Sequence, residues 1–230
     1  LNRQITCRIA DLHFAPTIAS RNNLLAENVA DDSIIVTGNT VIDALYSMID
    51  ESAKSAPYVA ENRRLILVTA HRRENFGRPF KDICRAIRFL VDNNSDIDVL
   101  FPVHPNPNIK SKAEELLGDI NQVTLCDPLD YIPFIGAMKA AYLILSDSGG
   151  VQEEAPSLGK PVLVMRDTTE RPEAVVAGTV LLVGTNEDLI VSKALDLLNN
   201  NENFIKMSKL HNPYGDGMAS KRIVDFIKNR

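Results

Sequence analysis

The sequence of 230 residues contains no tryptophan, three cysteines and no long apolar run. Its apolar runs, such as residues 65–68 and 142–145, end well before the roughly 20 residues that a membrane-spanning helix needs. We therefore expect no membrane span. Cys7, Cys84 and Cys126 lie far apart without a CxxC pair. This pattern argues against a zinc site or a disulfide framework and favours a reducing, cytoplasmic location.

An excess of positive charge is also absent, because 25 Lys and Arg residues stand against 30 Asp and Glu residues, for a net charge of −5. Nucleic-acid binders usually carry a basic stripe, so no nucleic-acid partner is expected. With 45% hydrophobic and 24% charged residues, the chain has the composition of an ordinary globular protein. It begins without Met and without the apolar core of a signal peptide, and we expect it to be part of a longer protein.

Apolar segments of strand length alternate with helical stretches over most of the chain. The expected strands are residues 65–70, 98–103, 123–126, 142–146, 161–165 and 179–183. Each is mostly apolar rather than alternating, which is typical of a parallel strand that is covered on both faces. Residues 79–91 and 189–198 carry helical periodicity. Alternating strands and helices predict an α/β fold with a doubly wound parallel sheet.

The chain divides into three parts by this interpretation. Residues 1–55 predict a strand at 10–14, a helix at 17–28, a strand at 33–36 and a helix from 40 onward, which is too little for a sheet domain of their own. They are interpreted as a remnant of another domain with a linker, the polar stretch 51–62 being the best linker candidate. Residues 56–212 form the sheet domain, and residues 213–230 end in a helix at 219–228.

Polar segments follow the expected strands at their carboxyl ends, where an α/β sheet binds its ligands. These segments are residues 71–77, 104–107, 147–154 and 166–172. Because several such segments meet at one edge of a parallel sheet, we expect them to form a common site.

Ser148, Gly149 and Gly150 lie between an expected strand and a helix. Two glycines there allow backbone N–H groups to approach a phosphate closely. The alternative is a tight turn that needs glycine for a positive φ. Glu154 follows in the same helix, where it would either accept hydrogen bonds from a ribose or compensate the helix dipole.

Other side chains at these strand ends also have two interpretations. Arg171 pairs with a phosphate or is a solvated surface arginine. His71, followed directly by Arg72, contacts an anion or transfers a proton, unless it is structural. His104 caps a rigid loop between two prolines or joins the site. Phe134 packs in the core or stacks on a base. Together these residues predict a site for a nucleoside diphosphate.

Four motifs carry a resemblance to a known family. AHRRENFG, PVHPNP, SDSGGVQEEAPSLGKPVLVMRDTTERPEA and VTGNTVIDAL resemble the non-hydrolysing UDP-N-acetylglucosamine 2-epimerases of bacteria. The resemblance implies the C-terminal half of a GT-B architecture plus a remnant of the N-terminal domain. It also implies interconversion of UDP-GlcNAc and UDP-ManNAc by elimination of UDP to a glycal and re-addition, without a metal or cofactor.

The resemblance implies a role for each matching residue. His71 would be catalytic, contacting the diphosphate and helping it to depart. Arg72 and His104 match positions that bind a second UDP-GlcNAc as an allosteric activator in some members. The UDP-binding residues would be Leu129, Phe134, Ser148, Gly149, Gly150, Glu154 and Arg171.

In this family the carboxylates for proton transfer at C2 belong to the N-terminal domain, which would precede Leu1. The resemblance therefore implies that the isolated chain does not epimerise but binds UDP weakly, and that homodimerisation belongs to the full-length protein. Two alternatives stay open. One is the nucleotide-sugar-binding half of a GT-B glycosyltransferase, and the other is a non-catalytic UDP-sugar-binding module.

Overall fold

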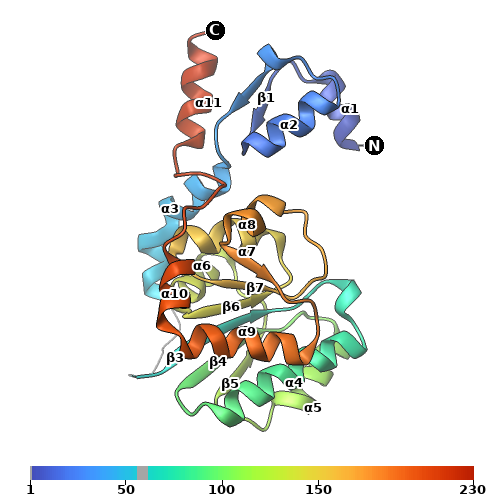
Figure 1. Ribbon diagram of the computed structural model, residues 1–230, viewed down its shortest axis with the longest axis vertical. Coiled ribbons are helices and arrows are strands. Elements are labelled where there is room, and N and C mark those ends of the chain that lie inside the picture. The colour runs from blue at the N-terminus through green and yellow to red at the C-terminus, as the bar shows by residue number, and fades with distance from the viewer. Residues whose placement is uncertain (1, 56–61) are drawn as a thin grey trace. The chain divides into compact units, whose positions relative to one another are not determined.

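The computed structural model describes residues 2–55 and 62–230. It comprises two compact units, one built of Leu1–Ser47 with Asn212–Arg230 and the other of Met48–His211 (Figure 1). The second unit nearly coincides with the expected sheet domain. The C-terminal segment, by contrast, belongs with the N-terminal residues in the first unit.

The second unit contains a six-stranded parallel sheet in the order β5-β4-β3-β6-β7-β8. All six expected strands are present, which confirms the α/β class. Their register is continuous across the centre, where Ile66 pairs with both Val99 and Leu143. The strands are β3 (Arg64–Thr69), β4 (Ile97–Pro102), β5 (Val123–Cys126), β6 (Leu143–Ser146), β7 (Val162–Val164) and β8 (Val180–Leu182).

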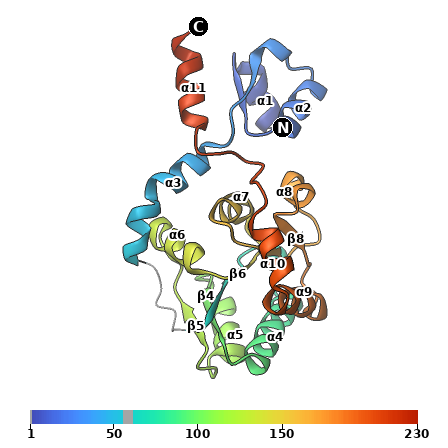
Figure 2. The same ribbon diagram turned by 60° about the vertical axis from the view of Figure 1, so that its left-hand side comes forward.

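Helices cover both faces of this sheet, as a doubly wound fold requires (Figures 1 and 2). Ile66 and Val68 share a buried cluster with α4 (Arg78–Asn93), α5 (Pro107–Leu117) and α9 (Glu187–Asn199). On the opposite face α6 (Tyr131–Ala140) contacts β3. The remaining elements of this unit are η2 (Ala53–Ser55), η3 (Arg73–Asn75), α7 (Gly149–Glu154), η4 (Ala155–Leu158), α8 (Pro172–Ala177) and α10 (Asn201–Ser208).

Helix α4 illustrates how the pattern of apolar residues determines packing. Phe80, Ile83, Ile87 and Leu90 recur at helical spacing and are all at most 1% exposed. Pro79 lies in the first turn, where its missing N–H has no helical partner to lose. The helix therefore presents one continuous apolar face to the sheet.

The strand order reverses direction between β3 and β6, which are neighbours in the sheet but far apart in the sequence. The connections that leave β3 and β6 cover opposite faces, so the loops at their carboxyl ends diverge. Such a switch point is where open α/β sheets form their ligand crevices.

The first unit contains a two-stranded parallel sheet of β1 (His13–Ala15) and β2 (Ile34–Val36). The strand expected at 10–14 was therefore placed too early, because residues 10 and 11 are exposed outside it. Helix α1 (Asn2–Ile9) was not predicted, since its mostly polar sequence buries no residue. The other elements are α2 (Ile18–Ala26), η1 (Asp31–Ser33) and α11 (Ala219–Lys228), with α3 (Thr40–Ser52) beginning in this unit. Of the expected linker 51–62, residues 56–61 lie outside the described residues.

Helix α11 is anchored to the N-terminal segment of the first unit. The Asp43 carboxylate accepts hydrogen bonds from the backbone N–H groups of Ala219 (3.1 Å) and Ser220 (2.8 Å). Because these N–H groups open a helix, Asp43 acts as its cap from a distant part of the sequence. At the other end of α11, Phe226 meets Phe14 edge to face with ring centroids 6.0 Å apart.

Candidate functional site

A pocket of about 430 Å³ lies at the carboxyl ends of β3, β4 and β6. It brings together most of the site residues that the sequence predicted, whereas Arg72, Gly149 and Arg171 do not line it. A larger hollow of about 970 Å³ in the first unit is lined by residues between Gln4 and Ser33 and by none of those predicted. The lining of the 430 Å³ pocket consists of Thr69, His71, Pro102, His104, Pro105, Pro128, Leu129, Phe134, Ser148, Gly150, Val151 and Glu154.

The floor of the pocket is fixed by hydroxyl groups at the ends of the two central strands. Thr69 Oγ1 and Ser146 Oγ lie 2.7 Å apart and share a buried hydrogen bond. Ser146 Oγ also accepts a hydrogen bond from the backbone N–H of Ser148 at 3.0 Å. A polar pair inside an otherwise apolar sheet costs little here because both hydroxyls are satisfied. It ties β3 to the start of the loop that carries Ser148.

Gly149 and Gly150 form the first turn of α7, where backbone N–H groups have no helical partner. Neither glycine has a φ in the left-handed region, so the turn does not require glycine. A Cβ on Gly150 would meet only Glu154 Oε2 and Ser148 Oγ, both at 3.9 Å. The conformational explanation for these glycines is therefore not supported. Because neither glycine has a Cβ, a ligand can approach the backbone N–H groups closely at this position.

The loop after β3 is tied to Asp147, which follows β6. Its carboxylate is fully buried, and Oδ2 accepts hydrogen bonds from the backbone N–H groups of His71 (2.9 Å) and Arg72 (2.8 Å). Asn75 Nδ2 donates a third at 2.9 Å. The side chain of His71 stays 44% exposed at the pocket wall. Sequence analysis missed Asp147, although a carboxylate directly after a buried strand is a signal for it.

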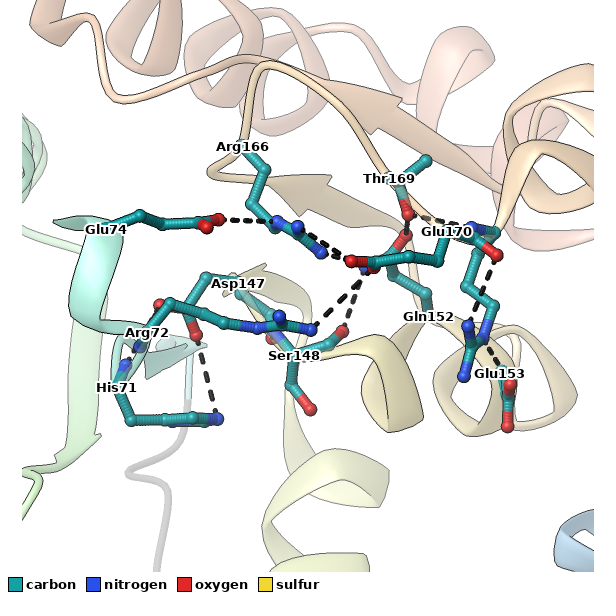
Figure 3. A network of polar contacts seen from close by, with 12 residues as sticks. His71, Arg72, Glu74, Asp147, Ser148, Gln152, Glu153, Arg166, Thr169 and Glu170 are labelled. Atoms are coloured by element: carbon teal, nitrogen blue, oxygen red, sulfur yellow. Dashed lines mark hydrogen bonds and ion pairs between the residues drawn. The ribbon is translucent and has the colours of Figure 1, made fainter. Parts of the chain in front are cut away.

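A charge network lies beside the pocket and includes Arg72 (Figure 3). Arg166, only 7% exposed, donates to Glu74 Oε1 at 2.9 Å and to Glu170 at 2.6 and 3.1 Å. The hydrogen bonds from Arg166 lower the pKa of Glu170 to about 2. Arg72 Nη2 lies 3.8 Å from the same Glu170 carboxylate. The predicted allosteric contact Arg72 thus already has an anionic neighbour.

Arg171 lies next to the glycine turn. A Cβ placed on Gly149 would come within 3.6 Å of Arg171 Nη2. The guanidinium forms an ion pair with Glu153 and donates to the carbonyl oxygen of Glu170 at 3.2 Å. Its backbone N–H donates to Thr169 Oγ1 at 3.1 Å. The arginine is therefore held at the edge of the turn by several contacts.

Glu154 is buried on the pocket wall and has a partner that the sequence did not reveal. Tyr131 Oη, at the start of α6, donates a hydrogen bond of 2.5 Å to Glu154 Oε1. Burial raises the pKa of Glu154, and the hydrogen bond from Tyr131 lowers it in part. Burial and the nearby carboxylate together raise the pKa of the Tyr131 hydroxyl.

His104 and Phe134 complete the walls. His104 Nδ1 accepts a hydrogen bond from the backbone N–H of Asn106 at 3.1 Å, so it also stabilises its own loop. Its ring meets Phe76 edge to face with centroids 6.1 Å apart. Phe134 is half-buried and lines the pocket together with Leu129. The pocket thus combines an aromatic ring, a carboxylate, an imidazole and free backbone N–H groups.

Two absences hold for the described ranges, 2–55 and 62–230. Within them, His, Cys, Asp and Glu residues form no group of three or more that is arranged to hold a metal ion. Over the same ranges no helix has both the length and the apolar character to span a membrane.

Comparisons with known proteins agree on one family. A family profile described as UDP-N-acetylglucosamine 2-epimerase matches residues 1–228. The UDP-N-acetylglucosamine 2-epimerase of Escherichia coli K12 is 52% identical over 238 residues, which cover 99% of this chain and 63% of that protein. This chain therefore spans less than two thirds of the length of that curated relative.

Two solved structures support the same assignment. The UDP-GlcNAc 2-epimerase of Neisseria meningitidis, bound to UDP-GlcNAc, has a TM-score of 0.92 and 45% identity and covers 100% of this chain and 64% of its own. The Methanocaldococcus jannaschii enzyme, in complex with UDP-GlcNAc and UDP, has a TM-score of 0.78 and 32% identity over 97% of this chain and 62% of its own. These matches confirm the resemblance read from the four motifs, and the chain belongs to the UDP-N-acetylglucosamine 2-epimerase family.

Proposed function

We propose that this chain supplies the UDP-binding part of a non-hydrolysing UDP-N-acetylglucosamine 2-epimerase, an isomerase that interconverts UDP-GlcNAc and UDP-ManNAc. The observation that carries the proposal is the pocket at the switch point, where His71, the glycine turn and Glu154 meet. The similarity to a structure bound to UDP-GlcNAc supports the choice of ligand.

Each part of UDP has a matching group in this proposal. The diphosphate lies at Ser148, Gly149 and Gly150, where bare Cα atoms leave the backbone N–H groups open. Arg171 approaches the same phosphates from beside Gly149. The ribose hydroxyls donate to Glu154, a group whose burial makes an added hydrogen-bond donor favourable. The uracil ring lies against Phe134, and the backbone near Leu129 contacts its edge.

The reaction is written as an elimination followed by an addition. A base removes the C2 proton of the sugar, the C1–O bond breaks with its electron pair, and UDP leaves as the more highly charged product. His71 donates a proton or hydrogen bond to the departing diphosphate. Reprotonation of C2 on the opposite face and re-addition of UDP then give the epimer. The sequence of steps is redox-neutral and needs no nicotinamide, and the resemblance to the family implies that it needs no metal.

In this scheme the carboxylates that act at C2 come from the rest of the family's length. The chain alone is therefore proposed to bind UDP without epimerising the sugar. The whole protein is proposed to work as a homodimer in the cytoplasm, in keeping with three scattered cysteines and an acidic net charge. Two other functions are weaker candidates. A GT-B glycosyltransferase half or a non-catalytic module would share the pocket, but the AHRRENFG segment and 52% identity to an epimerase favour the isomerase.

Calorimetry on the 230-residue chain tests the binding half of the proposal. UDP is expected to bind, and uridine, which lacks the diphosphate, is expected to bind at least tenfold more weakly, a difference of about 1.4 kcal/mol or more. Equal affinities would overturn the assignment of the glycine turn to the diphosphate.

The chemistry is tested on the protein extended to the full length of its relatives. Incubation of this longer protein with UDP-GlcNAc in D₂O should introduce deuterium at C2 of the sugar, and proton NMR would detect the loss of the C2 proton signal. The 230-residue chain should introduce no deuterium. Transfer of the sugar to an acceptor without deuterium at C2 would favour the glycosyltransferase.

A further inference from the structure

Asp147 is more than a structural anchor for the loop after β3. Its side chain is fully buried between β6 and α7, and one oxygen, Oδ2, is saturated by the three N–H groups of His71, Arg72 and Asn75. Three donors that converge on one oxygen fix the orientation of the carboxylate in a position from which water is excluded.

The second oxygen of Asp147 is the exception. Among the described residues, Oδ1 is the buried side-chain atom that lacks a hydrogen-bond partner. Leaving a buried acceptor unpaired costs about 1–3 kcal/mol, and more for a charged group. His71 Nε2 is a candidate donor and lies 3.7 Å from Oδ1, just beyond hydrogen-bond distance. Figure 3 shows the imidazole lying alongside this carboxylate.

We infer that Asp147 is a positioning residue for His71, whose Nε2–H is directed at the free Oδ1 and closes fully onto it when the site is occupied. The carboxylate holds the proton on Nε2 and orients the ring with or without ligand. In the imidazolium, Nδ1–H then faces the pocket and donates its proton to the departing diphosphate, which leaves the neutral Nε2–H tautomer. The logic is that of an acid–histidine pair in which the buried carboxylate fixes the tautomer and is not itself protonated.

The surrounding charges are compatible with this role. Arg72 follows His71, but its guanidinium faces Glu170. Glu154 and His104 line the same pocket as His71. Asp147 is distinguished from Glu154 and Glu170 by complete burial and by its direct approach to the imidazole. The role in leaving-group departure rests on the proposed function, whereas the pairing of the two side chains does not.

The test is long-range proton–nitrogen NMR of the 230-residue chain, with the His71 signals assigned from their loss in His71→Gln. In the unsubstituted chain with UDP bound, neutral His71 is expected to carry its proton on Nε2. Finding the proton on Nδ1 would overturn the inference, and this measurement needs no variant of Asp147 to fold.

Asp147→Asn keeps the shape of the side chain and one oxygen acceptor but removes the charge. The preference for the Nε2–H tautomer should be lost. Asp167→Asn, the same change at an exposed aspartate in the loop after β7, should leave the tautomer unchanged. An unchanged His71 in folded Asp147→Asn would show a purely structural role. Failure of UDP to bind the unsubstituted chain would instead refute the proposed function and leave the tautomer measurement, repeated without UDP, to decide the pairing.

Discussion

Tyr131 donates a 2.5 Å hydrogen bond to Glu154, joining the start of α6 to the middle of the pocket wall. The carboxylate is 6% exposed, whereas the tyrosine is 40% exposed and accessible from outside. The hydroxyl of a partly exposed residue thus lowers the pKa of a buried carboxyl group. Because the ribose of UDP is proposed to bind the same carboxylate, this pair also links protonation to ligand binding.

Tyr131→Phe is expected to raise the pKa of Glu154 further. The hydroxyl stabilises the charged carboxylate, and without it burial and the nearby charge of Glu153 raise the pKa unopposed. Carbon-13 NMR of the glutamate carboxyls across the acid range measures the change. Tyr142→Phe is the matched control, since Tyr142 donates to the carbonyl oxygen of Leu197 away from the pocket. A Glu154 pKa that stays the same or falls would show that the hydrogen bond contributes nothing in solution.

Gly150→Ala should separate binding from stability. A methyl group at this position meets no atom closer than 3.9 Å, and alanine is favoured over glycine in a helix by up to about 1 kcal/mol. The free energy of unfolding should therefore stay the same or rise. UDP affinity should fall at least tenfold, because the methyl group occupies the proposed approach of the phosphate. Urea unfolding and calorimetry measure the two quantities.

Gly159→Ala is the control, because it is expected to lower stability without lowering UDP affinity. Gly159 has a φ of +67°, and its Cβ would come 3.2 Å from the Ser208 carbonyl oxygen. That variant should lose about 1 kcal/mol or more of stability and keep its UDP affinity. A Gly150→Ala chain that binds UDP normally would remove the glycine turn from the phosphate site.

Arg171→Ala is expected to weaken UDP binding by about 1.5–3 kcal/mol, the usual contribution of a charge-assisted hydrogen bond. Arg171 does not line the empty pocket, so this effect requires the guanidinium to turn from Glu153 toward the phosphates. Arg85→Ala, which removes an exposed arginine of α4, should leave the affinity unchanged. Calorimetry showing equal affinities for Arg171→Ala and the parent chain would place the phosphates elsewhere.

Stability in acid should depend on Glu170. Its pKa lies at about 2 in the folded chain against an ordinary 4.5, so it binds its proton less readily when folded. The stabilisation is therefore complete above pH 4.5 and is lost as the pH falls toward 2. Because Glu170 is half-exposed, we expect only about 0.5–1 kcal/mol after solvent screening. Urea unfolding between pH 5 and pH 2.5 should show a shallower decline for Glu170→Gln. An identical decline would mean that the Arg166 contact is not stabilising.

The sheet could be predicted from the sequence because each strand is a short, mostly apolar segment and polar segments separate the strands from the helices. The polar segments also indicated the site, since His71 and Ser148 each lie two residues after the end of β3 and β6. Helix α1 escaped prediction because it has no buried face to create a period. The strand before α2 was misplaced by a few residues for a related reason, since three residues are too short a run to show its limits.

Partners were harder to predict than positions. The position of Asp147 after β6 marks it as a candidate, but nothing in the local sequence shows that its carboxylate binds a loop more than 70 residues earlier in the chain. Tyr131 reaches Glu154 across 23 residues of sequence in the same way. Arg166 was visible as a strand-end arginine, but its two glutamate partners become neighbours only once the sheet has formed. The spacing of residues in the sequence indicates where polar groups gather, whereas only the tertiary structure shows which of them contact one another.

The Asp43 cap on α11 has a consequence for biosynthesis. The first unit is completed by residues made after the second unit, which is synthesised in between. The sheet of the second unit can therefore form with local partners, whereas the N-terminal part of the first unit is completed only when α11 follows. During that interval the early segment exposes the apolar surface that Phe226 later covers, and chaperones would be expected to recognise it there.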